Sequence, residues 1–146
     1  MLHKDLMEMI VVRGFVSIPP ETSVFKAVIV MMEHNIGSLL VMAGKQFLGI
    51  VSERDIAWMM SIEEEHPERT NIKSIMTPAE RVVTVTRHTN EDECLDLMRE
   101  HNIRHLVVLE EGQVVGILSI KDLALGYKED HYRRIRDMEG YLAKLS

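Results

Sequence analysis

Apolar residues alternate along the chain between short continuous runs and a helical spacing, and this alternation occurs twice. In the first half, apolar positions recur at i, i+3, i+4 and i+7, which predicts a helix with one buried face. Thr22 or Ser23 suits the N-cap of this helix, and Asn35 and Gly37 mark its end. The positions that carry the spacing are Val24, Ala27, Val28, Met31 and Met32.

The continuous apolar runs predict strands. Residues 39–42 and 47–51 flank a Gly-Lys turn, which is typical of a β-hairpin. Residues 16–18 form an earlier short strand that ends at two prolines, because proline cannot donate a hydrogen bond to a sheet. Ser52 then caps a helix over 53–61.

The second half repeats this order. It predicts a strand at 83–85, a helix at 90–101 capped by Thr89 or Asn90, a hairpin about Gly112 and a helix at 120–126. Residues 15–55 align with 82–122 without a gap, at an offset of 67, and 14 of the 41 pairs are identical. Chance gives roughly two or three identities at average composition. We infer a tandem duplication.

Each unit has the order β-α-β-β-α, and about 60 residues are too few to bury such a sheet well. We therefore expect an α/β (α+β) fold in which two units pack about a pseudo-twofold axis. A tail from about Glu129 to Leu145 has apolar residues near helical spacing and predicts an amphipathic helix. The expected organisation is an arm or short helix at 1–14, a first unit at 15–62, a linker at 63–77, a second unit at 78–126 and a C-terminal helix at 127–146.

One heptapeptide carries the candidate chemistry. It has the pattern Gly-x-x-Ser-x-x-Asp and occurs at 49–55 and again at 116–122. A cation precedes each aspartate, Arg54 in one copy and Lys121 in the other. Ser-x-x-Asp also fits a capped helix start, which stabilises a helix by about 1 kcal/mol. The duplication at identical spacing favours a ligand site over a cap alone.

These residues resemble a known family, the tandem pair of cystathionine-β-synthase (CBS) domains, or Bateman module. NIGSLLV with GIVSERD, and NIRHLVVLEEGQVVGILSIKD, carry the resemblance, which covers residues 15–126. The chain is similar to the short stand-alone bacterial form, which has no catalytic domain. The resemblance implies that an adenosyl ligand binds in clefts between the units: AMP first, otherwise ADP, ATP, NAD(H) or S-adenosylmethionine. Each aspartate would accept hydrogen bonds from ribose hydroxyls.

The resemblance also implies which residues line each pocket. The Arg104-His105 pair supplies cationic donors to the first pocket, whereas the equivalent Gly37-Ser38 pair supplies none to the second, so we expect the first pocket to bind phosphate better. The first pocket would comprise Ser52, Asp55, Arg104, His105 and Lys121, with backbone at Val82, Val83 and Thr84. The second pocket would comprise Ser119, Asp122, Gly37, Ser38 and Arg54, with backbone at Phe15, Val16 and Ser17.

Composition narrows the functional classes. The chain has 146 residues and a net charge of −6, which disfavours binding to nucleic acid or to an anionic membrane. Cys94 is the single cysteine and lies on the apolar side of a predicted helix, so we expect a buried, inert thiol. No apolar run approaches the roughly 20 residues of a membrane span, and we expect a cytoplasmic protein. The histidines lack metal-ligand spacing, so we expect no metal site.

Three hypotheses follow. The first is a non-enzymatic regulatory module whose occupancy changes conformation and is read by a protein effector. The second is an interaction scaffold or dimerisation module with vestigial pockets, for which the Gly37-Ser38 side argues. The third, an enzyme, lacks a base-nucleophile pair, a metal cluster and a phosphate-binding glycine loop, so we expect no catalytic residues and no catalytic cofactor. Trp58 lies on an unusually apolar helix end, and the resemblance implies that this helix lies at a subunit interface, so we expect a homodimer.

Overall fold

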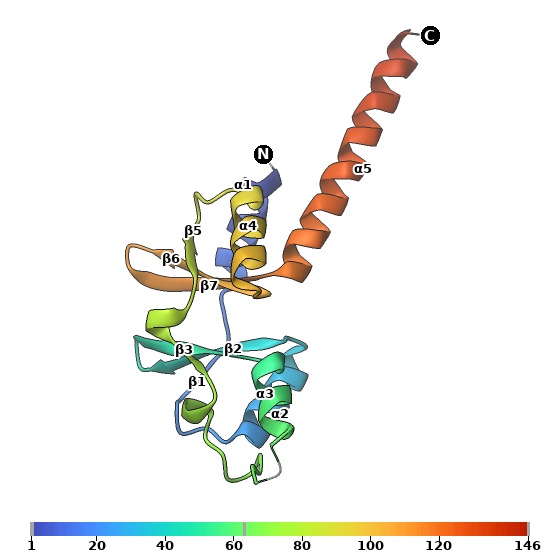
Figure 1. Cartoon of the computed structure of the whole chain (residues 1–146). Coiled ribbons are helices and arrows are strands. Elements are labelled where there is room, and N and C mark those ends of the chain that lie inside the picture. The colour runs from blue at the N-terminus through green and yellow to red at the C-terminus, as the bar shows by residue number, and fades with distance from the viewer. Residues whose placement is uncertain (1, 63, 146) are drawn as a thin grey trace. The chain divides into compact units, whose positions relative to one another are not determined.

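The computed structural model describes residues 2–62 and 64–145 and forms two compact units (Figure 1). The central unit comprises Phe15–Val83. The terminal unit is formed by the described residues up to Gly14 together with those from Thr84 onward. Each unit contains a small β-sheet and helices, so the expected mixed α/β fold is confirmed.

The central unit has a four-stranded sheet in the order β1-β2-β3-β4. β1 pairs with β2 in parallel, whereas β2 and β3 form the predicted antiparallel hairpin and β4 pairs antiparallel with β3. The register shifts by one residue between Val41 and Met42. The elements are β1 (Ser17–Ile18), α2 (Val24–His34), β2 (Ser38–Ala43), β3 (Gln46–Ser52), α3 (Glu53–Met60), the 3₁₀ turn η1 (Ile72–Ser74), β4 (Thr77–Pro78) and the 3₁₀ turn η2 (Ala79–Arg81).

Helix α2 begins and ends as its sequence predicts. Of the two candidate caps the structure uses Ser23, whose side chain accepts a hydrogen bond from the Lys26 amide at 3.1 Å. Asn35 ends the helix in the left-handed conformation, with φ of 53°. One face of α2 packs against the sheet to form the core of this unit, which comprises Ile18, Val24, Ala27, Met31, Leu39, Val41, Val51, Met59 and Ile72.

The segment after α3 belongs to the central unit. The amide of Val24 donates to the Thr70 carbonyl at 2.8 Å, and that of Phe25 donates to Pro67 at 2.9 Å. The amide of Ile72 donates to Thr22, also at 2.8 Å. The bonds from Val24 and Phe25 satisfy amides at the start of α2 that have no partner within the helix.

The terminal unit repeats this plan with a three-stranded sheet in the order β5-β6-β7. β5 and β6 are parallel, and the β6–β7 hairpin shifts register between Val108 and Leu109, the positions equivalent to Val41 and Met42. Asn102 ends the helix of this unit with φ of 51°. The elements are α1 (Leu2–Arg13), β5 (Thr84–Thr86), α4 (Glu91–His101), β6 (His105–Glu110), β7 (Gln113–Ser119) and α5 (Ile120–Leu145).

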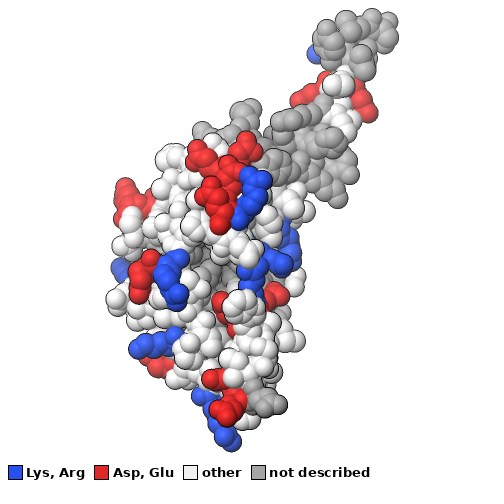
Figure 2. Space-filling view, viewed as in Figure 1, with Lys and Arg blue, Asp and Glu red and all other residues white. Residues whose placement is uncertain are grey.

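Helix α4 combines an apolar face with an acidic start. Asn90 caps it by accepting from the Glu93 amide at 2.9 Å, and Cys94 and Met98 are buried beneath it. Its first turn carries Glu91, Asp92 and Glu93, where carboxylates interact favourably with the helix dipole. Acidic side chains gather over this helix in Figure 2, in keeping with the net negative charge.

The N-terminal residues form a docked helix. α1 contacts β7 and α5, and Ile10 at its centre is only 1% exposed. The two helices expected over 120–126 and from about 129 are instead one continuous helix, α5. A mid-helix glycine costs about 1 kcal/mol, but nothing between the two segments forces a break. At Gly126 a Cβ atom would lie 3.4 Å from Cδ2 of Leu6, an ordinary van der Waals contact, so α5 and α1 pack together here.

Candidate functional site

Ser52 and Asp55 form a reciprocal cap at the junction of β3 and α3. The Ser52 amide donates to Oδ2 of Asp55 at 2.8 Å, and its hydroxyl donates to the same oxygen at 3.0 Å. The Asp55 amide donates back to Oγ of Ser52 at 3.4 Å. Among the described residues of the central unit, the hydrogen bonds to the Asp55 carboxylate reach only Oδ2. The capping interpretation holds, and it leaves Oδ1 available as an acceptor.

Ser119 and Asp122 form the same cap at the junction of β7 and α5. The Ser119 amide and hydroxyl donate to Oδ2 of Asp122 at 2.8 and 3.0 Å, and the Asp122 amide donates to Oγ of Ser119 at 3.1 Å. The two copies of the heptapeptide therefore fold alike within their own units. They differ in the additional hydrogen-bond donors that contact the aspartate carboxylate.

Arg13 binds the Asp122 carboxylate with both ends of its guanidinium. Nη1 donates to Oδ1 at 3.0 Å and Nη2 donates to Oδ2 at 3.1 Å. Nη2 also donates to the Ile117 carbonyl at 3.0 Å. Burial alone would raise the pKa of Asp122, but the Arg13 hydrogen bond, the Ser119 hydrogen bonds and the Arg13 charge together hold it below its usual value. Sequence reasoning missed Arg13.

The residue pairs that precede each hairpin lie beside the heptapeptide of their own unit. Gly37 accepts from the Glu53 amide at 3.0 Å, and buried Ser38 lies opposite Ser52. In the terminal unit Arg104 accepts from the Ile120 amide at 2.9 Å, and His105 lies opposite Ser119. The chain thus brings each pair to its own motif. The exchange of these pairs between the two pockets stays a prediction.

The remaining site candidates divide between the two units. The central unit contains Arg54, Val16, Ser17, Val82 and Val83, and the terminal unit contains Thr84 and Lys121. The Val16 carbonyl is used by the sheet, since it accepts from the Leu40 amide at 3.1 Å. Lys121 is exposed and Arg54 is half-buried.

A family model for the CBS domain matches this chain twice, at residues 4–61 and 72–128. The chain belongs to the CBS domain family. The two matches cover both heptapeptides and both hairpins, and the expected resemblance is confirmed.

Relatives of this CBS pair include short CBS proteins. The mitochondrial CBS domain-containing protein CBSX3 of Arabidopsis thaliana is 29% identical over 125 residues, which is 84% of this chain and 61% of that protein. A CBS domain crystal structure is 37% identical, covers 83% of this chain and 93% of its own, and superposes with a TM-score of 0.74. A CBS domain protein of Pyrobaculum aerophilum, solved in complex with AMP, is 26% identical over 82% of this chain and 88% of its own, with a TM-score of 0.69.

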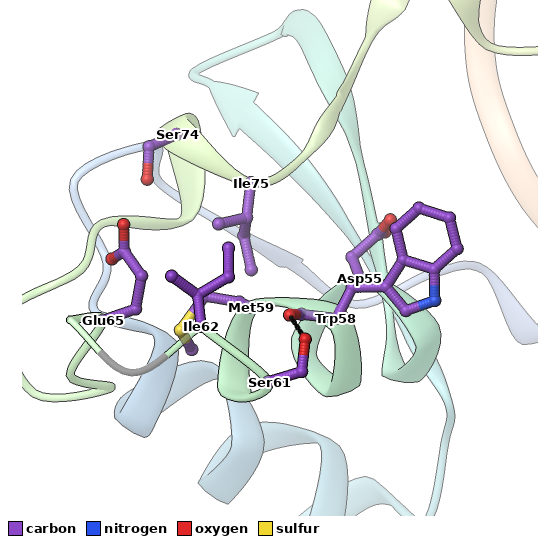
Figure 3. Close-up of a pocket in the computed structure, with 8 residues that line it drawn as sticks. All are labelled: Asp55, Trp58, Met59, Ser61, Ile62, Glu65, Ser74 and Ile75. Carbon is purple, nitrogen blue, oxygen red and sulfur yellow. Dashed lines mark hydrogen bonds between the residues drawn. The ribbon is translucent and has the colours of Figure 1, made fainter.

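A hollow of about 540 Å³ lies on the central unit beside α3 (Figure 3). Trp58, Ile62 and the carboxylate residues Asp55 and Glu65 border this hollow. The Trp58 side chain is 73% exposed. The Ser61 hydroxyl donates a hydrogen bond to the Trp58 carbonyl at 2.6 Å. The CBS pair therefore presents an apolar surface immediately next to the Asp55 carboxylate.

The other chemically active side chains are accounted for structurally. Cys94 is fully buried, as predicted, and burial followed by the charges of Glu93 and Glu91 raises the pKa of its thiol to about 11. Among the described residues, no three His, Cys, Asp or Glu side chains are grouped to hold a metal ion. Within the same residues, no helix has the length and hydropathy to cross a membrane.

Proposed function

We propose that this CBS pair is a non-enzymatic regulatory module that binds an adenosyl ligand, AMP first, and transmits its occupancy to a protein effector by a conformational change. ADP, ATP and NAD(H) are the other ligands of the same chemistry. The AMP complex of the Pyrobaculum aerophilum relative supports an adenine nucleotide as the ligand.

The observation that carries this proposal is the state of the Asp55 carboxylate. Its Oδ2 is held by Ser52, which fixes the side chain before a ligand arrives. No hydrogen bond reaches its Oδ1 from the described residues of the central unit, so it can accept from a ribose hydroxyl. A pre-positioned acceptor costs no side-chain entropy on binding.

The proposed assembly is a homodimer that uses the apolar surface of α3. Trp58, Met60 and Ile62 are 73%, 55% and 55% exposed. Three large apolar side chains within five residues are costly to leave in water. A second copy of the chain would cover them and lie next to Asp55, which offers a route from ligand occupancy to assembly.

A second candidate, an interaction scaffold without ligand, is favoured by one observation. Glu53 covers Gly37 so closely that a Cβ atom there would overlap with its carboxylate oxygen. The Gly37-Ser38 side therefore carries a negative charge, which opposes phosphate. A protein that gains no stability from any adenosyl compound would be this scaffold.

Thermal shift with AMP, ATP, NADH and S-adenosylmethionine tests the proposal. Bound ligand increases the free energy of unfolding by mass action, by about 2.7 kcal/mol at a hundredfold excess over Kd, and so raises the melting temperature. Asp55→Asn keeps an oxygen for the Ser52 cap but loses the charge, and we expect it to abolish the shift. Asp96→Asn, at an exposed carboxylate on α4, is the matched control and should shift like the wild type. Equal shifts in both variants would exclude Asp55 as the ligand contact.

A further inference from the structure

The 67-residue offset between the two repeated segments, 15–55 and 82–122, also relates residues that precede these segments. At Gly116 a Cβ atom would meet Ile10, and at Gly49 it would overlap with the Thr77 carbonyl. Ile10 and Thr77 are themselves 67 residues apart, as are Gly49 and Gly116. α1 therefore approaches β7 as the β4–η2 segment approaches β3, although one is an α-helix and the other is not.

This equivalence pairs Arg13 with Glu80, since 80 − 13 = 67. Arg13 is the last residue of α1 and holds Asp122. Glu80 lies in η2, is exposed, and carries the opposite charge. A carboxylate at this position cannot donate a hydrogen bond to Asp55 as Arg13 does to Asp122. The two positions that the offset pairs thus carry opposite charges, and Arg81 follows Glu80 in η2.

The Arg13 contact consumes the acceptor capacity that a ribose needs. Oδ1 of Asp122 is bound by Nη1, and Oδ2 is bound by Nη2 and by the Ser119 amide and hydroxyl. A bidentate arginine-carboxylate pair is charge-assisted and stronger than hydrogen bonds from neutral hydroxyls. A ribose at Asp122 must first displace it.

The position of Arg13 is fixed by the fold of the terminal unit. Ile10 is buried one turn earlier, and Gly14 ends the helix with φ of 72° and donates to the Ile10 carbonyl at 3.0 Å. A glycine adopts this left-handed conformation without strain. The guanidinium is therefore presented to Asp122 by a docked helix end, and not by a free chain terminus.

We propose that Arg13 is an internal occupant of the Asp122 motif and that the charge at positions 13 and 80 determines which motif takes a nucleotide. This inference rests on the proposed adenosyl function. It assigns one nucleotide to each wild-type chain, at Asp55. Arg13→Gln frees Asp122 and raises the number to two. Glu80→Arg supplies Asp55 with an occupant of its own and lowers the number to zero.

Native mass spectrometry and calorimetric titration with AMP measure these numbers. We expect one AMP per wild-type chain, two per Arg13→Gln chain and none per Glu80→Arg chain. In Arg13→Gln, the affinity of the Asp122 motif for AMP should be at least about tenfold higher than in the wild type. Arg13→Gln combined with Asp55→Ala should bind one. Arg99→Gln, which breaks the exposed pair with Asp96, is the matched control and should bind one like the wild type.

The outcomes separate this inference from the function on which it rests. If the wild type and all variants bind no AMP, the proposed function fails. If the wild type binds one AMP and both Arg13→Gln and Glu80→Arg also bind one, the function stands and the role of Arg13 is overturned. Two AMP molecules on the wild type overturn it as well. Because Glu80 is exposed, Glu80→Arg carries the test even if Arg13→Gln does not fold.

Discussion

Ile10 lies directly on Gly116, where a Cβ atom would come within 2.8 Å of its Cγ2 and 3.2 Å of its carbonyl oxygen. The glycine of the heptapeptide thus has a packing role besides its place in the motif. It lets α1 dock on β7, and that docking carries Arg13 to Asp122. Gly49 plays the same part against Thr77 in the central unit.

The two glycines predict different costs for the same substitution. Gly49→Ala meets the Thr77 backbone, which cannot move without breaking β4, so we expect a loss of about 1–3 kcal/mol in the free energy of unfolding. Gly116→Ala meets first Cγ2 of Ile10, at 2.8 Å, and the Ile10 backbone only at 3.2 Å, so its overlap with backbone is smaller and it should cost less. Urea unfolding measures both.

Gly140→Ala is the control for that pair, because nothing lies within 4 Å of a Cβ there and the residue is in α5. Alanine favours a helix over glycine by about 1 kcal/mol, so this variant should be no less stable than the wild type. Equal losses for Gly49→Ala and Gly116→Ala would contradict the distinction between backbone and side-chain contacts.

The Arg13–Asp122 pair predicts a dependence of stability on pH. The pKa of Asp122 is lowered in the folded protein, so its ionisation contributes stability that is fully present above the ordinary aspartate pKa of about 4 and is lost as pH falls through the folded value. In Arg13→Gln, burial is no longer opposed by Arg13, so the loss begins at higher pH. We expect a deficit of about 1 kcal/mol near neutrality, since Arg13 is half exposed.

Melting temperatures between pH 2.5 and 7 check this dependence. The deficit of Arg13→Gln should shrink toward acid pH, where Asp122 is protonated in both proteins. Arg99→Gln serves as control, because its pair with Asp96 is exposed on both sides and should change stability little at any pH. Parallel profiles for Arg13→Gln and the wild type would show that the pair contributes nothing to folding.

Local chemistry made most of the fold predictable. The hairpins follow from apolar runs around short turns, and α2 and α4 follow from their spacing and from Ser23 and Asn90 as caps. Arg13 was not predictable in this way. Its role depends on how α1 docks on β7, and the pair Ile10/Thr77 shares no identity that would extend the repeat backwards. The sequence signal that pointed to Arg13 was the 67-residue offset of the repeat. Extended toward the N-terminus beyond residue 15, this offset pairs Arg13 with Glu80.

Cys94 should be unreactive in the native protein. The thiolate is the nucleophile, and a pKa of about 11 leaves only about a thousandth of the thiol ionised at pH 8. Burial also blocks access to the reagent. We expect labelling with a disulfide reagent to be slow in buffer and rapid in urea, with Cys94→Ser as the blank. Rapid stoichiometric labelling of the folded protein would show that α4 opens readily.

The apolar surface of α3 makes the last prediction. A carboxylate at Trp58 would be buried unpaired in the proposed homodimer, which costs several kcal/mol. In the free chain the same residue is 73% exposed, so Trp58→Glu should leave folding intact. We therefore expect light scattering to report a dimer for the wild type and a monomer for Trp58→Glu, with unchanged circular dichroism. Val12→Glu, at an 87% exposed apolar residue of α1, is the matched control and should remain dimeric. A wild-type monomer, or a dimer that survives Trp58→Glu, would rule out this surface as the interface.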